Sequence, residues 1–214
     1  MKLTKYEHAC VVLEEQGKKL VIDPGAFTQG LGELTDIAAV VVTHQHADHF
    51  EPRWLQQIVA ANPSVQLFAP SDVAQLAKEL PITVVTGGAK ANAEPFTLRF
   101  YGERHAEIHA DYMDMPENVG VLVNGNVYYP GDSFDKPDLP VHTLLAPVSG
   151  PWLKIGETIS FVEDLKPKLV VPTHNALLSE IAITMTEQWL SGVCEKHGVG
   201  YSHLTPGASL ELPA

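Results

Sequence analysis

The sequence has few cysteines and few basic residues, and it lacks a long apolar run. Cys10 and Cys194 are its only cysteines, so a disulfide framework is not expected, and their apolar neighbours predict two buried thiols. Lys and Arg number 14 against 26 Asp and Glu, a net charge of -12, which opposes binding to nucleic acid or anionic membranes. No segment is long enough for a transmembrane helix, and residues 1–4 show no secretory signal. We therefore expect a cytoplasmic protein that neither inserts into a membrane nor binds nucleic acid.

The order of strand and helix patterns indicates one domain with two similar halves. With 214 residues, 45% of them hydrophobic, we expect residues 1–214 to form a single domain. The first half predicts strands at 2–6, 9–14, 18–22, 38–43, 66–69 and 82–85, and helices at 52–61 and 72–79. A strand predicted at 96–101 ends this half, and the second half predicts strands at 119–123, 127–129, 144–148 and 169–172, and helices at 157–165 and 176–196. This alternation favours the α/β (α+β) class, with helices covering sheets.

Residues 43–49, THQHADH, concentrate ligand-type side chains after the apolar strand predicted at 38–43. Three imidazoles and a carboxylate are costly to bury unless something charged binds them. Side chains two apart in a strand share a face, so His44 and His46 are expected to point to one place, with Asp48 and His49 reaching a second point nearby. Imidazole and carboxylate are typical ligands of zinc, iron and manganese. The spacing therefore indicates a metal site rather than a solvated polar loop.

Further ligand-type residues follow other predicted strands. Asp132 comes after the strand at 127–129, and His174 follows the strand at 169–172. His105 and His109 both follow the strand at 96–101. Position alone leaves both histidines open as ligands, and the one that does not bind the metal, such as His109 one helical turn later, would line the pocket. The sequence contains no Gly-x-Ser-x-Gly element, so a serine nucleophile is unsupported.

Taken together, these motifs resemble the metallo-β-lactamase superfamily from the N-terminus to about His174. The resemblance is carried by VIDPG at 21–25, THQHADH at 43–49, a later histidine, a Gly-Asp pair and a final strand-end histidine. NVG at 118–120, YPGDSF at 129–134 and GPW at 150–152 resemble its small bacterial metal-dependent hydrolases, which are similar to the ascorbate 6-phosphate lactonase and N-acyl phosphatidylethanolamine phospholipase D groups. The resemblance implies a four-layer αββα sandwich whose edge binds two divalent ions, Zn in the first place, with Mn or Fe as alternatives.

The same resemblance assigns the ligands of the two ions. It implies that the first ion is bound by His44, His46 and His105, the second by Asp48, His49 and His174, and that Asp132 bridges them. Asp23 resembles an aspartate that supports the HxHxDH loop, although an ordinary strand-end Asp before a Pro-Gly turn has the same sequence. The branch often has Asp after the final histidine, where this chain has Asn175.

Three more residues are candidates for orienting the metal ligands or for lining the substrate pocket. His8 is expected to approach the site from the first hairpin, and a structural histidine fits its position equally well. The loop at 147–154 follows a strand on the same edge, where Trp152 and Lys154 would supply an aromatic wall and a cation for an anionic group. A core tryptophan and a solvated lysine are equally compatible with that loop.

The ligand set and the resemblance predict a metal-dependent hydrolase. A divalent ion lowers the pKa of bound water from about 15.7 to about 7, which makes hydroxide available at neutral pH, and Asp48 or Asp132 would accept its proton. The expected substrate is a small anionic ester, lactone, amide or phosphodiester. The alternatives are a mononuclear iron persulfide dioxygenase and a catalytically silent binding protein of the same fold. The sequence is compatible with a homo-oligomer.

Overall fold

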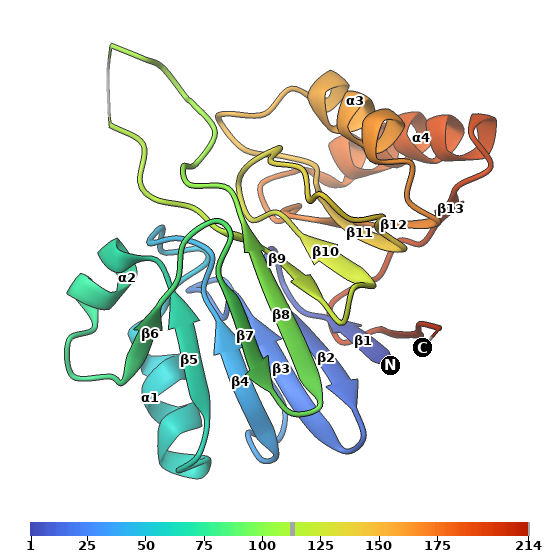
Figure 1. Cartoon of the computed structure of the whole chain (residues 1–214). Coiled ribbons are helices and arrows are strands. Elements are labelled where there is room, and N and C mark those ends of the chain that lie inside the picture. The colour runs from blue at the N-terminus through green and yellow to red at the C-terminus, as the bar shows by residue number, and fades with distance from the viewer. Residues whose placement is uncertain (112–113, 214) are drawn as a thin grey trace.

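The computed structural model describes residues 1–111 and 114–213 and contains two stacked sheets of seven strands each (Figure 1). The first sheet contains, in spatial order, β14 (Ser209–Glu211), β1 (Lys2–Lys5), β2 (Val11–Glu15), β3 (Lys18–Ile22), β4 (Ile37–Val41), β5 (Gln66–Ala69) and β6 (Ile82–Val84). The second contains β13 (Gly200–Tyr201), β12 (Leu169–Thr173), β11 (Thr143–Pro147), β10 (Val127–Tyr129), β9 (Gly120–Val123), β8 (Phe96–Tyr101) and β7 (Lys90–Ala93).

Helices cover the outer face of each sheet, so the layers follow the order αββα (Figure 1). The helices are α1 (Pro52–Ala61), α2 (Ser71–Leu76), α3 (Ile155–Leu165) and α4 (Glu180–Lys196). Three apolar clusters fill the space between layers: one lies between the sheets, one lies under α1 and α2, and one lies under α3 and α4. The four-layer sandwich implied by the sequence is confirmed. In the described part of the chain, no helix combines the length and apolarity that crossing a membrane requires.

The two halves of the chain follow the same course. In the first, β1, β2 and β3 pair antiparallel, and β3 to β6 continue as parallel strands. In the second, β7 to β10 pair antiparallel, and β10 to β13 are parallel. Parallel strands in one sheet all end at the same edge. The loops after β3 and β4 therefore meet the loops after β10, β11 and β12 at one edge of the sandwich.

Several element boundaries differ from the sequence predictions. β4 ends at Val41 rather than at Thr43, so His44 and His46 lie in a loop and not in a strand. α4 begins at Glu180 rather than near 176, because the Ser179 side chain caps the helix by accepting a hydrogen bond from the Ala182 N–H at 3.3 Å. β7, β13 and β14 were not predicted, since these short edge strands carry little apolar pattern.

Both cysteines are buried and free, as predicted. The apolar residues that precede Cys194 at helical spacing do not share its face of α4. Leu190 and Cys194 are buried, whereas Ile181, Met185 and Trp189 are exposed. Ile181, Met185 and Trp189 therefore form an apolar stripe with i, i+4 spacing on α4 that faces solvent instead of the core.

Candidate metal centre

Seven ligand-type side chains from four different loops meet at the edge where the parallel strands end. His44, His46, Asp48 and His49 lie between β4 and α1, while His105, Asp132 and His174 follow β8, β10 and β12. Together with His8 they form three overlapping groups, within each of which the potential ligand atoms lie within 4.8 Å of one another: His44, His46 and His105; His44, His49 and Asp132; and His8, Asp48, His49 and His174. The structure thus brings together every residue that the sequence suggested as a ligand.

The first group contains three imidazoles and no carboxylate. The ring centroids of His46 and His105 lie 4.7 Å apart, and those of His44 and His105 lie 5.0 Å apart. His44 Nε2 lies 3.1 Å from His46 Nδ1. Burial, reinforced by the charge of His49, lowers the pKa of His44 well below its ordinary value. Three imidazoles facing one point are a typical zinc-binding set.

The other two groups, taken together as the second group from here on, combine imidazoles with the carboxylates of Asp48 and Asp132. Asp48 Oδ2 lies 3.4 Å from His174 Nε2, and Asp132 Oδ2 lies 3.1 Å from the same nitrogen. Asp132 Oδ1 lies 3.1 Å from His49 Nε2, and its Oδ2 lies 3.3 Å from His105 Nε2. Asp132 therefore contacts imidazoles of both the first and the second group, which is the position expected of a bridging ligand.

Opposed charges shift the pKa values of this second group. Burial by itself would raise the pKa of Asp132, but the neighbouring His49 and His174 outweigh it and hold that pKa well below its usual range. Burial would lower the pKa of His49, yet the charges of Asp132 and Asp23 outweigh it and raise that pKa well above 6.5. For Asp48 the neighbouring His174 and His8 imidazoles likewise outweigh burial and lower the pKa. The carboxylates are therefore ionised throughout the physiological range.

The buried nitrogens and oxygens of this cluster show that a cation fits it. Among the described residues, His49 Nε2, His105 Nε2, His174 Nε2 and Asp132 Oδ1 are buried and make no hydrogen bond of acceptable geometry. The three nitrogens lie 3.1 to 3.3 Å from one or the other carboxylate oxygen of Asp132, but these contacts converge on shared points instead of forming donor and acceptor pairs. Buried polar atoms left in this way are costly. Metal ions coordinated by the same atoms would remove that cost, so the residues present fit the metal set that the sequence suggested.

Asp23 supports the loop after β4. Its carboxylate is fully buried and accepts hydrogen bonds from the Thr43 N–H and the Thr43 hydroxyl, both at 2.7 Å. Its Oδ2 also lies 2.6 Å from His49 Nδ1. This contact assigns the proton of a neutral His49 to Nδ1 and leaves the Nε2 lone pair directed at the cluster.

Two glycines permit the close packing of these loops. A Cβ on Gly25, in the turn after Asp23, would lie 1.9 Å from the backbone oxygen of Asp48. A Cβ on Gly131 would lie 2.4 Å from Asn118 Oδ1, which accepts the Asp132 N–H. Any side chain at either glycine would displace a candidate ligand, which explains the Pro-Gly and Gly-Asp sequences physically.

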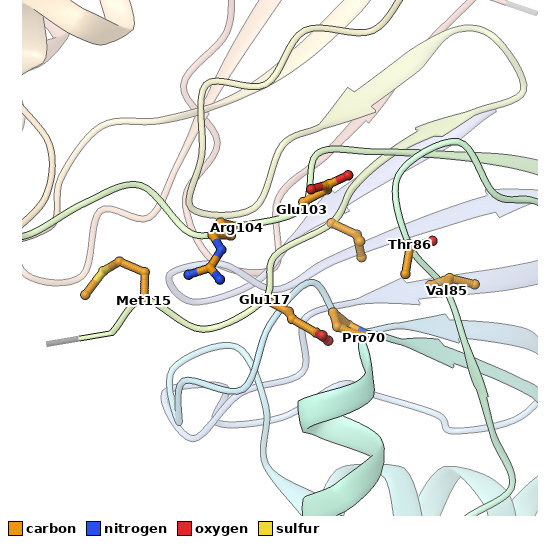
Figure 2. Close-up of a pocket in the computed structure, with 8 residues that line it drawn as sticks. Pro70, Val85, Thr86, Glu103, Arg104, Met115 and Glu117 are labelled. Atoms are coloured by element: carbon orange, nitrogen blue, oxygen red, sulfur yellow. The ribbon is translucent and has the colours of Figure 1, made fainter. Parts of the chain in front are cut away.

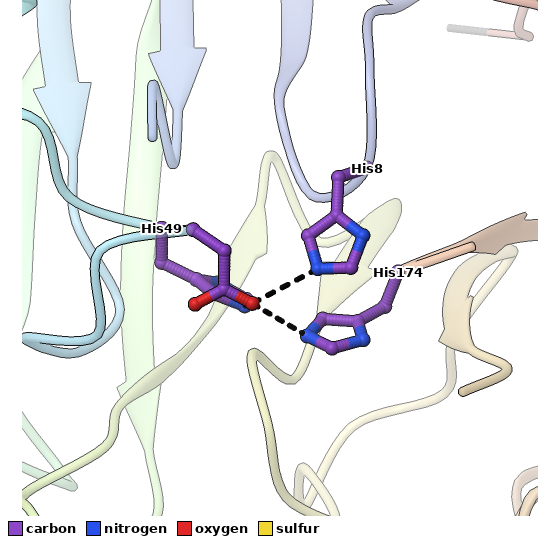
Figure 3. Close-up of side chains that lie close together, drawn as sticks. His8, His49 and His174 are labelled. Carbon is purple, nitrogen blue, oxygen red and sulfur yellow. Dashed lines mark hydrogen bonds and ion pairs between the residues drawn. The ribbon is translucent and has the colours of Figure 1, made fainter. Parts of the chain in front are cut away.

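His8 contacts the cluster without having a free lone pair for a metal ion. Its Nδ1 accepts the Ala176 N–H at 3.2 Å, so in the neutral ring Nε2 carries the proton. Nε2 donates to Asp48 Oδ2 at 3.0 Å, and Figure 3 shows His8 and His174 directed at that same carboxylate oxygen. Burial lowers the pKa of His8 to about 4, which keeps the ring neutral. His8 therefore orients Asp48 by hydrogen bonding.

Of the two candidates in the loop after β11, one reaches the cluster and one does not. Trp152 is buried, and its indole N–H donates to Asp132 Oδ2 at 2.8 Å. Lys154 lies at the start of α3, where its backbone N–H donates to Glu157, and it lines a separate surface pocket with Lys136 and Asp164. The structure therefore gives Trp152 a polar contact in the site and does not bring Lys154 to the cluster.

His105 and His109 are clearly separated by the fold. His105 is buried and belongs to the first group of ligand atoms. His109 is exposed, and its Nδ1 accepts the Asp111 N–H at 3.3 Å. Among the described residues, His109 takes part in none of the three groups.

A pocket of about 400 Å³ adjoins the segment that carries His105. Figure 2 shows Glu103 and Arg104, which directly precede His105, on its wall opposite Pro70 and Val85. The Glu117 carboxylate, also on the wall, accepts hydrogen bonds from the backbone N–H and hydroxyl of Ser71 at 2.7 and 2.9 Å. The same stretch of chain thus forms one wall of the pocket and places a candidate ligand.

Sequence patterns did not identify the roles of two residues. Lys5 and Asn175 hydrogen-bond to each other beside the cluster, at 3.2 Å. A signal existed for Lys5, because it lies two residues after buried Leu3 in β1 and therefore shares its inward face. The role of Asn175 depends on contacts with the N-terminal strand and had no local signal.

The comparisons with known proteins agree with this geometry. The family described as β-lactamase superfamily domain matches residues 2–174. Protein Rv0786c from Mycobacterium tuberculosis is 32% identical over 185 residues, which cover 84% of this chain and 86% of the relative. A UPF0173 metal-dependent hydrolase from Aeropyrum pernix is 28% identical over 200 residues, covering 81% of each chain. The structure of Igni18, a metallo hydrolase from Ignicoccus hospitalis, is similar with a TM-score of 0.74 over 99% of both chains at 20% identity, which supports the fold.

Proposed function

The chain belongs to the metallo-β-lactamase superfamily and is a metal-dependent hydrolase, and we propose that it binds two divalent ions and cleaves a small anionic ester, lactone, amide or phosphodiester. The observation that carries this proposal is the set of buried, unpaired ligand atoms at the edge of the sandwich. Zinc is the preferred ion, since imidazoles predominate in the site.

Two buried free thiols fit a reducing compartment, and we propose that the protein is located in the cytoplasm. We further propose that residues 1–214 form one domain, because the C-terminal strand β14 completes the first sheet.

The ligands divide into two sets in this proposal. His44, His46 and His105 would hold the first ion, Asp48, His49 and His174 would hold the second, and Asp132 would be shared between them. Asp23 fixes the tautomer of His49, and the Trp152 indole N–H fixes the orientation of Asp132. A divalent ion supplies an activated water and stabilises negative charge on the substrate oxygen.

Asp48 is the better placed of the two carboxylates to take part in proton transfer. Its side chain is 23% exposed, whereas that of Asp132 is 3% exposed and also accepts the Trp152 indole N–H. A proton acceptor must lie within hydrogen-bond reach of the substrate or attacking water. We therefore assign proton acceptance to Asp48 and a purely structural bridging role to Asp132.

The pocket beside His105 is the proposed location for the part of the substrate that does not react. Arg104 supplies a cation on its wall, and Val85, Met115 and Val119 supply apolar surface. The Glu117 carboxylate is already bound by the hydrogen bonds from Ser71. Phe27, an exposed aromatic residue whose ring centroid lies 5.1 Å from that of His8, supplies further apolar surface next to the second group.

A hydrolase panel tests this proposal. The purified chain is assayed on lactones, carboxylic esters, amides and phosphodiesters before and after chelation, and again after addition of Zn²⁺ or Mn²⁺. We expect turnover of at least one class, loss with chelator and recovery with metal. His49→Ala should remove the activity, while His109→Ala, a histidine outside the cluster, should retain it. Turnover that survives both chelation and His49→Ala would contradict the proposal.

A further inference from the structure

Lys5 is buried without a carboxylate partner. Only 1% of its surface is exposed, and no ion pair in the described part of the chain includes it. Its Nζ donates to the Tyr6 carbonyl at 3.0 Å and to Asn175 Oδ1 at 3.2 Å. Burying an ammonium group among neutral acceptors is costly compared with burying an apolar side chain of the same length. Packing alone therefore does not account for a lysine at this position.

Asn175, which accepts the Lys5 hydrogen bond, directly follows His174. Histidines that bind metal ions are usually oriented by a hydrogen bond to the ring nitrogen that does not bind the ion. In His174 that nitrogen, Nδ1, makes no hydrogen bond within the described residues. The ring of His174 must therefore be oriented by its backbone and by its contact with His8, whose ring centroid lies 3.9 Å away.

The backbone at His174 is attached to the turn between β1 and β2. The His174 N–H donates to the His8 carbonyl at 2.9 Å, and the Ala176 N–H donates to His8 Nδ1 at 3.2 Å. The Lys5 hydrogen bond to Asn175 is the third link between the two segments. His174 has a φ of 57°, in the left-handed region that non-glycine residues rarely adopt, so its loop needs such support.

We infer that Lys5 is a positioning residue for His174: its hydrogen bond to Asn175 fixes the loop that carries this ligand and strengthens binding of the second divalent ion. The inference rests on the proposed two-ion site. Lys5 acts through Asn175 and the backbone, and it touches neither the ions nor the substrate. The other two links keep the loop folded when this hydrogen bond is removed, so the loss appears as weaker ion binding.

The test compares ion affinities of the metal-free chain and its variants. Zn²⁺ binding is measured by competition with a chelator, and Co²⁺ absorption spectra report the coordination geometry of each bound metal ion. Lys5→Met should lower the affinity for the second metal ion by about 10- to 100-fold and leave the affinity for the first unchanged. Its melting temperature without metal should not fall, because the substitution removes a buried charge. Lys2→Met, an exposed lysine of the same strand, is the matched control.

Variants of Asn175 separate positioning from general damage. Asn175→Leu should lower the affinity for the second metal ion as much as Lys5→Met does. The double variant should bind that ion with the same affinity as either single variant. Asn175→Asp keeps the acceptor and should bind at wild-type affinity or above. A wild-type chain that binds only one ion overturns the two-ion proposal and this inference with it. If the wild type binds two ions and Lys5→Met binds both with unchanged affinity, this inference alone is overturned. It is also overturned if the melting temperature of metal-free Lys5→Met falls below that of the wild type, because that result indicates a structural role.

Discussion

Replacing Asp23 by Asn tests how the fold directs His49 toward an ion. The carboxylate accepts three hydrogen bonds: two from Thr43 at 2.7 Å and one at the His49 Nδ1 contact of 2.6 Å. Asn keeps the oxygen that accepts the Thr43 N–H but places an N–H donor where Oδ2 stood. That donor faces His49 Nδ1, so the imidazole proton moves to Nε2 to avoid two opposed donors. His49 then presents an N–H, and no longer a lone pair, toward Asp132 and the ion.

The expected loss is large for ion binding and moderate for stability. Substitution of a residue that orients a ligand typically weakens metal binding by about 10- to 100-fold. The altered hydrogen bonds cost about 1–3 kcal/mol, which corresponds to a melting temperature lower by roughly 2–12 °C for a chain of this size. Asp23→Ala leaves three buried donors unsatisfied and should cost about 3–5 kcal/mol. The conservative variant therefore separates ion binding from folding better than the truncation does.

The assay combines zinc affinity by chelator competition with thermal melting of the metal-free chain. Asp36→Asn is the control, because this exposed carboxylate pairs with Lys18 far from the cluster and the variant carries the same chemical change. We expect one of the two zinc equivalents to bind more weakly to Asp23→Asn and both to bind unchanged to Asp36→Asn. Two zinc ions bound by Asp23→Asn with wild-type affinity would refute the argument about the His49 tautomer.

Three further predictions concern individual side chains. Asp48→Asn should lower turnover by at least ~100-fold without unfolding the chain, and full turnover with both ions bound would exclude Asp48 from the chemistry. His105→Ala should empty the first ion position while His109→Ala leaves metal content unchanged; the reverse pattern in elemental analysis would contradict the assignment. Burial lowers the pKa of Lys5 from 10.5 to about 8, so the unfolded chain binds the extra proton between these values and stability rises with pH there. The free energy of unfolding of the wild type should rise by about 3 kcal/mol relative to that of Lys5→Met between pH 7 and pH 10.5 in denaturant titrations. The same pH dependence in both proteins would show that burial does not lower the pKa of Lys5.

The sequence predicted the fold where the pattern was strong and local. The buried run of β4 and the Pro52 start of α1 could be predicted, because apolar runs and helix starts depend on neighbouring residues. The exposed stripe of Ile181, Met185 and Trp189 on α4 could not, since helical spacing shows which residues share a face and not which face is covered. The register of β14 against β1 depends on pairing between the two chain ends, which local patterns do not specify.

The ligand-type residues could be proposed from sequence because each follows a strand end with little else to explain it. The residues that orient them were harder to find, since a hydrogen bond such as that from Trp152 to Asp132 joins loops from different strands. The expectation for Lys154 rested on its position in a loop at the right edge, but its side chain direction depends on the start of α3. Strand alternation was the expected reason for the proximity of His44 and His46, yet the two rings meet in a loop beyond the end of β4.

Metal content per chain is the most direct test of the central proposal. The protein is purified without added metal, and then again after incubation with Zn²⁺ and gel filtration, and Zn, Mn and Fe are quantified against protein concentration. The seven converging ligands predict about two divalent ions per wild-type chain, with a clear loss in Asp132→Ala, which lacks the bridging carboxylate. A single iron with no second metal would contradict the two-ion site and favour the dioxygenase alternative, and a chain that binds no metal would contradict the account as a whole.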